Sequence, residues 1–296
     1  MFPKVHRREF LKASTGLVMA TVGSFAPDFA RGSLQGVAPK KLIDVNVTLS
    51  RWPGRRLPFD EISTLVAKLR SEGVTQAWAG SFDGLLHKDL ASVNVRLADE
   101  CRRHGRGILL PFGSINPRLP DWEEELRRCD EDHRMHGIRL HPNYHGYRLD
   151  DPGFERLLDR ATERRLLLQL VVAMEDERMQ HPLLRAPRVD LGPLPELVQK
   201  RPGLRLVLLN WFGGVKTELL EKLAKAGQIY FDIAMVEGVG GVAKLLGQVP
   251  PSRVVFGSHA PFFYFDSALL KLKESALAET PLGGICAANA VRLLNG

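Results

Sequence analysis

The sequence predicts a single α/β domain, a closed (β/α)8 (TIM) barrel. Short apolar segments alternate with amphipathic ones through eight successive units, which predicts a parallel sheet. Eight such units in a chain of 296 residues, 44% of them hydrophobic, favour a closed barrel with one large core. A doubly wound open sheet is the alternative. No glycine-rich phosphate loop follows an early strand, which disfavours it.

The first 30 residues predict an export signal of the twin-arginine (Tat) type. Arg7 and Arg8 precede a mildly apolar run over residues 13–26, and small residues follow. A basic surface helix is the alternative. We therefore expect a signal peptide over residues 1–30, a barrel domain over residues 31–296, and a periplasmic or extracellular protein.

Eight apolar segments after the signal are expected to form strands. They are Leu42–Leu49, Val74–Ser81, Gly107–Ile115, Gly137–His141, Leu166–Met174, Leu204–Asn210, Ile229–Ala234 and Arg253–Ser258. In the first strand, strict alternation predicts that Asp44, Asn46 and Thr48 share one face.

Amphipathic segments between the strands are expected to form helices. They are Asp60–Ser71, Leu90–His104, Asp121–Met135, Pro152–Arg164, Leu194–Lys200, Thr217–Ala226, Val239–Gly247 and Phe265–Ala278. Asp60 is expected to cap the first of them, and Pro152 suits a first helical turn. Gly73, Gly105 and Gly227 stand where helices should end.

Charge and cysteine content narrow the class of protein. Of the net charge of +7, the signal contributes +2, because four basic residues there oppose two acidic ones. The remaining +5 is spread along helices beside acidic residues, as over residues 123–128, which indicates solvated helix surface and no nucleic-acid partner. It modestly favours anionic substrates. No apolar run reaches the length of a membrane span.

The three cysteines do not suggest a disulfide framework or a metal knuckle. Cys101, Cys129 and Cys286 are odd in number and lack short spacing. We expect buried thiols.

Polar side chains occur at the end of nearly every expected strand. In barrels of this type the active site lies at the carboxyl ends of the strands. Those that we expect to bind substrate are Asp44, Asn46, Arg139, His145, Asn210, Trp211 and Asp232. His141 ends the fourth expected strand, His259 follows the eighth, and both are the expected catalytic residues.

Five segments together resemble the amidohydrolase-related family, relatives of aminocarboxymuconate-semialdehyde decarboxylase and other metal-dependent hydrolases. They are IDVNVT (43–48), GIRLHPNYHGYRLDDPGFERLL (137–158), LRLVLLNWFGG (204–214), RVVFGSHAPFF (253–263) and NAVRLL (289–294). The resemblance runs from Ile43 to Leu294 and implies hydrolysis or a carbon–carbon cleavage. Barrels of this family often pair, so a homodimer is expected.

The resemblance also implies a metal site that this chain does not reproduce. The family pattern is His-x-His after strand one, one His on strands five and six, and an Asp on strand eight, binding Zn²⁺ or a similar ion. The matching positions here are Asn46, Thr48, Val171, Asn210 and His259. We therefore expect no metal by the usual pattern and leave the cofactor unknown, with zinc still open.

Three interpretations of the site remain. In the first, an atypical hydrolase or C–C lyase acts on a small organic substrate, either anionic or neutral, with His259 and His141 transferring protons. In the second, His141, His145 and His259, with Asp232, form a relocated metal site. We favour the first.

The third interpretation is a non-catalytic ligand-binding or sensing barrel. It would use the aromatic side chains Trp211, Phe262, Phe263 and Tyr264. Whichever holds, Asp44 and Arg139 are expected to form a buried pair, because a lone buried charge is costly.

Overall fold

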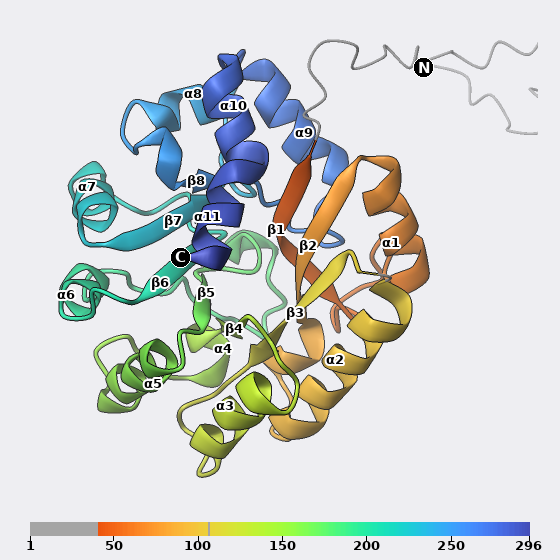
Figure 1. Cartoon of the computed structure of the whole chain (residues 1–296), viewed down its shortest axis with the longest axis vertical. Coiled ribbons are helices and arrows are strands. Elements are labelled where there is room, and N and C mark those ends of the chain that lie inside the picture. Colours follow the sequence, from red (N-terminus) through yellow and green to blue (C-terminus); the bar gives the residue numbers. More distant parts are fainter. Residues whose placement is uncertain (1–40, 106) are drawn as a thin grey trace, which may run out of the picture. The chain divides into compact units, whose positions relative to one another are not determined.

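The computed structural model describes residues 41–105 and 107–296 (Figure 1). The predicted signal over residues 1–30 lies outside the described residues. None of the helices in the described part is both long and apolar enough to cross a membrane.

Eight parallel strands follow one another around the sheet in the order of the sequence. They are β1 (Leu42–Leu49), β2 (Val74–Ser81), β3 (Leu109–Ser114), β4 (Gly137–Leu140), β5 (Leu167–Val171), β6 (Arg205–Leu209), β7 (Gln228–Asp232) and β8 (Val254–Val255). The segment after β8 closes the ring on β1, where the Val45 amide donates to the Phe256 carbonyl at 3.0 Å and the Thr48 amide to the Ala260 carbonyl at 2.9 Å. The predicted (β/α)8 barrel is confirmed.

The last strand is shorter than the sequence predicts. Ladder pairing ends at Val255, because the Phe256 amide donates to the Ile285 carbonyl at 2.9 Å and not to β7. Residues 256–258, which were expected to end this strand, lie outside its pairing with β7.

Helices surround the sheet, one after each strand, and further short helices follow β4 and α9 (Figure 1). The α-helices are α1 (Ile62–Ser71), α2 (Leu90–Gly105), α3 (Trp122–Glu131), α4 (Pro142–His145), α5 (Pro152–Glu163), α6 (Leu194–Gln199), α7 (Thr217–Lys225), α8 (Gly241–Leu246), α9 (Phe265–Glu274), α10 (Glu279–Gly283) and α11 (Asn289–Asn295). The single turns are η1 (Phe82–Leu85), η2 (Glu177–Met179), η3 (Pro251–Arg253) and η4 (Gly284–Ala288).

The predicted helix ends hold only in part. Asp60 is not the cap of α1; Glu61 takes that position, and the Asp60 carboxylate accepts two hydrogen bonds from Arg56, at 2.6 and 2.9 Å. A salt bridge within the preceding loop therefore competes with the cap. Gly73 has φ +78° directly after α1, a conformation that suits glycine. Gly105 is the last residue of α2 and does not lie beyond it.

Alternate residues of the strands face the barrel interior and the helix layer. In β5, Leu167 and Val171 belong to the inner cluster, whereas Leu168 and Leu170 pack in the outer one. The first strand breaks this rule because its register with β2 shifts between Asp44 and Val47. The prediction that one face of β1 carries all its polar residues by simple alternation is therefore wrong.

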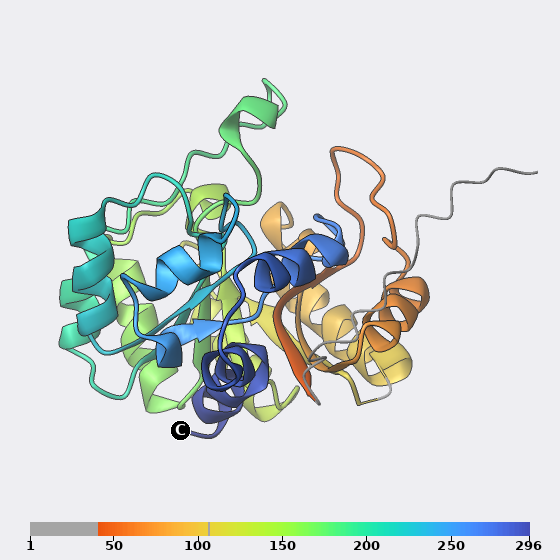
Figure 2. The ribbon, with the colours of Figure 1, turned by 90° about the horizontal axis from the view of Figure 1, so that it is seen from above.

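The C-terminal segment closes the end of the barrel where the strands begin. Ala290 and Leu293 of α11 pack in the inner cluster. Arg205, the first residue of β6, donates to the carbonyls of Leu293 and Leu294 at 2.9 and 3.1 Å. In Figure 2, α11 lies at one end of the barrel and the β1–α1 and β5–α6 loops project at the other. Any site must therefore open among these loops.

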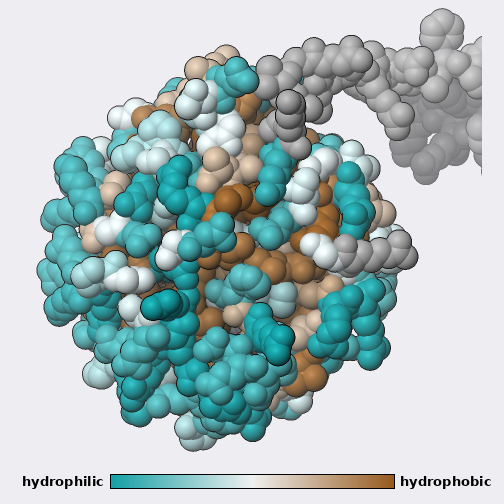
Figure 3. Space-filling view, viewed as in Figure 1, coloured by the Kyte–Doolittle hydropathy of each residue, from teal (hydrophilic) through white to brown (hydrophobic). Residues whose placement is uncertain are grey.

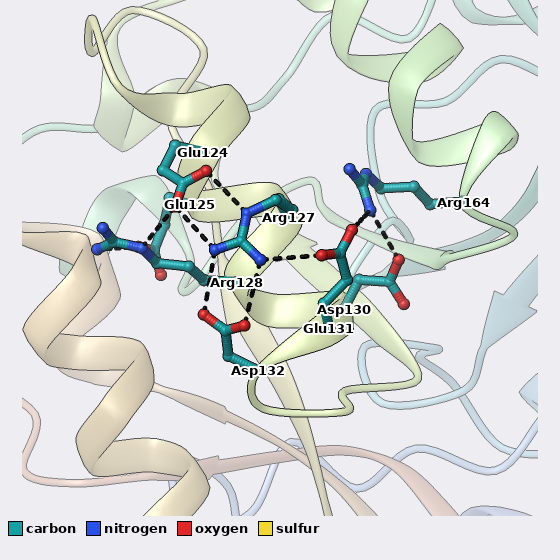
Figure 4. Close-up of polar contacts among 8 residues, drawn as sticks. All are labelled: Glu124, Glu125, Arg127, Arg128, Asp130, Glu131, Asp132 and Arg164. Atoms are coloured by element: carbon teal, nitrogen blue, oxygen red, sulfur yellow. Dashed lines mark hydrogen bonds and ion pairs between the residues drawn. The ribbon is translucent and has the colours of Figure 1, made fainter.

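The outer helices carry a hydrophilic surface. In the view of Figure 3, hydrophilic side chains dominate the periphery and hydrophobic ones gather near the middle. On α3, Arg127 pairs with Glu124, Glu131 and Asp132 at 2.8, 2.9 and 3.2 Å, and Arg164 after α5 joins Glu131 (Figure 4). These side chains are partly exposed, so the helix surface is solvated, as predicted. Such pairs contribute about 0–1 kcal/mol each to stability.

The expectation of buried thiols is confirmed. Cys101, Cys129 and Cys286 are all buried and free. Burial raises the pKa of the Cys101 thiol to about 12, which makes it a poor nucleophile.

Candidate active site at the carboxyl ends of the strands

Three of the residues predicted to bind substrate meet inside the barrel. Asn46 Nδ2 donates to Asn210 Oδ1 at 2.8 Å and to Asp232 Oδ2 at 2.7 Å. The backbone N–H of Asn210 donates to Asp232 Oδ1 at 3.0 Å. The three side chains are buried, so β1, β6 and β7 are tied together by polar groups that satisfy one another.

Two buried carboxyl groups hold this part of the barrel. Burial raises the pKa of Asp232 to about 7, although the hydrogen bonds from Asn46 and Asn210 oppose the shift. Burial likewise raises the pKa of Asp44 to about 6. Asp44 accepts hydrogen bonds from Ser258 Oγ at 2.5 Å and from the Ser258 amide at 3.0 Å. It therefore fixes the segment after β8 against β1.

Arg139 lies in the interior as predicted, but it does not pair directly with Asp44. Its guanidinium donates to Gln169 Oε1 at 2.7 Å and to the carbonyls of Val47 and Trp78 at 2.8 and 2.9 Å. The predicted Asp44–Arg139 pair is wrong, because backbone carbonyls of β1 and β2 offer Arg139 closer acceptors. Burial lowers the pKa of Arg139 to about 9, although the negative charges of Asp44 and Asp232 oppose the shift.

His259 is enclosed by aromatic rings and a backbone carbonyl. Its Nε2 lies 2.9 Å from the Met174 carbonyl oxygen, which can only accept, so Nε2 carries the proton and Nδ1 the lone pair. The ring stacks on Phe262 with centroids 4.9 Å apart and meets Phe263 edge-on at 5.0 Å. Burial lowers the pKa of His259 to about 3, so the ring is neutral at pH 7.

His141 is buried at the end of β4 and faces His145. The two ring centroids are 6.0 Å apart, and His145 Nε2 lies 2.8 Å from the Gly84 carbonyl oxygen. Nδ1 of each histidine has no hydrogen-bond partner among residues 41–105 and 107–296. Burial lowers the pKa of His141 well below its usual value.

The described residues do not assemble a metal-binding set. Within the part of the chain that the structure describes, no three His, Cys, Asp or Glu side chains are placed to hold an ion, so His141, His145 and His259 form no such set. At the usual family positions, Asn46 binds Asn210 and Asp232, and Thr48 Oγ1 accepts from Arg139 at 3.1 Å. These donors are neutral and already engaged, so they do not fit a divalent ion.

A cavity of about 810 Å³ opens at the carboxyl ends of β5 to β8. Its apolar wall includes Phe212 and Phe263, and its charged groups include Arg188, Glu237 and Lys271. Phe263 lines this cavity and also contacts the His259 ring, so the histidine and the cavity share this side chain.

Two basic side chains of this cavity are held by backbone carbonyls. Arg188 donates to the carbonyls of Trp211 and Phe212 at 2.9 and 2.7 Å, and Lys271 Nζ donates to the Ala234 carbonyl. Neither forms an ion pair with any described residue, and burial lowers the pKa of both. Arg178, by contrast, is paired with Asp176 at 2.5 Å.

Arg188 and Lys271 are not among the site residues expected from the sequence. For Lys271 a signal exists, because helical spacing places it on the same side of α9 as the buried residues Ala268 and Leu272. For Arg188 we find none, since its loop has no periodic pattern.

The aromatic residues separate into two groups. Trp211 is buried and donates from Nε1 to the Asp232 carbonyl at 2.9 Å, so it supports the barrel and does not line the cavity. Phe262 is also buried, and Tyr264 is 67% exposed. Only Phe263 of the four predicted aromatic residues reaches the cavity wall.

A (β/α)8 barrel with polar side chains and a cavity at the carboxyl ends of its strands has the architecture of a barrel enzyme. The chain belongs to the amidohydrolase family: the family model described as Amidohydrolase matches residues 54–296. The resemblance seen in the sequence is thereby confirmed at the level of the family.

Solved structures with the same fold include decarboxylases. The 2,6-dihydroxybenzoate decarboxylase from Rhizobium is 15% identical, with TM-score 0.64 over 88% of this chain and 99% of the other. The 5-carboxyvanillate decarboxylase from Sphingomonas paucimobilis is 14% identical, with TM-score 0.65 over 86% and 99%. A dihydroxybenzoic acid decarboxylase from Polaromonas sp. JS666, with bound manganese and 2-nitroresorcinol, is 11% identical, with TM-score 0.65 over 86% and 97%. No curated protein matches the chain by sequence.

Proposed function

We propose that this protein is an atypical hydrolase or C–C lyase whose small organic substrate binds in the cavity beside His259. The observation that carries the proposal is the position of Phe263, which lines the cavity and meets the His259 ring at 5.0 Å. Movement of this one side chain would bring a ligand to the imidazole.

In this proposal His259 accepts a proton through Nδ1, because its Nε2 donates to Met174. Its low pKa makes it a weak base, so it would act on an acidic proton of a bound substrate. His141, whose Nδ1 has no partner among the described residues, is the second proton-transfer group. Asn46, Asn210 and Asp232 already bind one another, so a substrate would have to replace some of these hydrogen bonds. Substrate binding by them stays a prediction.

The substrate class follows from the cavity wall. Arg188 and Lys271 are the basic groups left without an ion pair there, although Glu237 and Glu274 also line the cavity. An anionic group placed near the two cations, with an aromatic body against Phe212 and Phe263, fits this lining. The decarboxylases with the same fold act on aromatic carboxylates by name, which makes this class the one to test first.

We propose that acid–base chemistry by protein side chains replaces the usual metal site. The donor set supports this, because Asn46 and Asn210 are neutral, bound to each other, and close to a carboxyl group that is itself buried.

A non-catalytic ligand-binding protein is the second candidate. It is favoured by the enclosure of His259, which is 1% exposed, and by the mutual satisfaction of the polar groups around it. Such a protein would bind its ligand without changing it.

Turnover and binding, measured together, separate the two candidates. Purified protein would be incubated with aromatic carboxylates and the matching esters and amides, following release of carbon dioxide or acid, while calorimetry records binding. Turnover that is lost in His259→Gln supports the enzyme. Binding without turnover supports the second candidate. If no compound is either bound or turned over, both candidates are contradicted.

Export through the Tat route and a homodimer complete the proposal. N-terminal sequencing of protein from the periplasm tests the first, and light scattering of the purified protein tests the second. Intracellular, unprocessed protein and a monomer would be the contrary results.

A further inference from the structure

Lys271 occupies an unusual place for a lysine. It lies on α9, is partly buried, and lines the cavity of about 810 Å³ above β7 and β8. It is the only lysine among the described residues that line this cavity. Its Nζ donates to the Ala234 carbonyl, which holds the amine at the cavity wall.

Burial makes the neutral, nucleophilic form of Lys271 easier to reach than that of an exposed lysine. Burial lowers its pKa, while the negative charges of Asp232 and Glu237 oppose the shift. No described residue forms an ion pair with it, whereas Lys68, also partly buried, pairs with Glu72 at 2.6 Å. A lysine amine that is desolvated and not neutralised by an ion pair reacts with carbonyl groups more readily than an exposed one.

Groups that can move protons lie in the same cavity. Glu237 and Glu274 line it with Lys271, and both are exposed to solvent there. The apolar side chains of Phe212 and Phe263 offer a surface for the body of an organic ligand.

We propose that Lys271 forms an imine with aldehyde or ketone ligands that enter this cavity. The lone pair of Nζ attacks the carbonyl carbon, the C–O π bond breaks, and a proton passes from nitrogen to oxygen through Glu237. The carbinolamine then loses its hydroxyl group together with the remaining proton on nitrogen as one water molecule, and a C=N bond forms. No oxidant or reductant takes part. The inference rests on the proposed function only for the cavity as the ligand site.

Reductive trapping tests this step directly. Full-length protein is treated with 4-carboxybenzaldehyde and sodium cyanoborohydride, which reduces the imine to a stable secondary amine. Peptide mapping by mass spectrometry then gives the labelling rate of each lysine. We expect Lys271 to be labelled severalfold faster than Lys273, an exposed lysine on the same helix that does not line the cavity.

Variants and an unreactive analogue complete the test. Lys271→Arg should lose the fast label, and Lys273→Arg should keep it. Equal or slower labelling of Lys271 than of Lys273 would overturn the proposal. If 4-(hydroxymethyl)benzoate binds while Lys271 stays unlabelled, the imine is wrong and the cavity stands as a ligand site. If Lys271 is labelled fast but this analogue neither binds nor competes, the imine stands and the aromatic carboxylate class fails.

Discussion

His259 Nε2 and the Met174 carbonyl oxygen, 2.9 Å apart, join the segment after β8 to the segment after β5. This contact fixes the imidazole as a neutral ring with its proton on Nε2. Because burial lowers the pKa of His259 to about 3, its ring nitrogens should not titrate between about pH 5 and 8. Nitrogen-15 NMR, with the signal assigned through His259→Gln, checks this. A midpoint within that interval would show that the ring is accessible to water.

Asn46 should be hard to replace. Asn46→Ala leaves Asn210 Oδ1 and Asp232 Oδ2 buried with one donor fewer, and we expect a loss of about 1–3 kcal/mol in the free energy of unfolding. Asn46→Asp should cost more, because it places a second carboxyl group beside Asp232. Urea unfolding measures both, with Asn143→Ala, at a part-exposed position of the short helix α4, as the control expected within about 0.5 kcal/mol. If Asn46→Asp left the free energy of unfolding unchanged, the hydrogen bonds of Asn46 with Asn210 and Asp232 would not be formed.

Stability should fall as the pH rises through the window set by Asp232. Its pKa is about 7 in the folded chain against 3.8 for a free side chain. Between pH 3.8 and about 7 the folded chain therefore keeps a proton on Asp232 that the unfolded chain has lost. The contribution is therefore fully present below about pH 4 and is lost as the pH approaches 7, at about 1.4 kcal/mol per pKa unit.

Asp232→Asn isolates this effect, because the variant cannot ionise at that position. The difference in unfolding free energy, wild type minus variant, should decrease from pH 4 to 7 and level off above. Urea unfolding at several pH values gives this difference, in which titrating groups that do not interact with Asp232 cancel. A difference that is constant with pH would show that Asp232 is ionised in the folded protein.

Arg205 should hold α11 against the barrel. Its guanidinium donates to the carbonyls of Leu293 and Leu294, so Arg205→Ala removes charge-assisted hydrogen bonds at a helix end. We expect a loss of about 2–3 kcal/mol and faster hydrogen exchange in residues 289–295. Arg292→Ala, an exposed change on the same helix, is the control. Unchanged exchange in the Arg205 variant would contradict this role for the side chain.

The sequence predicted the barrel well because hydrophobic periodicity and alternation are local signals. The bounds of β1 and β2 agree with the prediction, whereas β8 is shorter because the Phe256 amide binds Ile285, a contact far along the chain. No local pattern could show that the register of β1 shifts after Asp44.

The site was predictable only in its membership. Polar residues at the strand ends do meet, as Asn46, Asn210 and Asp232 show. Whether they face a ligand or one another depends on side-chain geometry, and here they bind one another. Arg188 and Lys271 reach the cavity from a loop and from a helix, where strand-end reasoning does not look.

The position of a bound ligand tests the central claim most directly. Crystals of the protein soaked with 2,6-dihydroxybenzoate would show where a small aromatic carboxylate is held. The account predicts electron density in the cavity bounded by Arg188, Phe263 and Lys271, with the carboxylate near the two basic groups. Density on the barrel axis between Asn46 and Asn210, with their hydrogen bond broken, would contradict it.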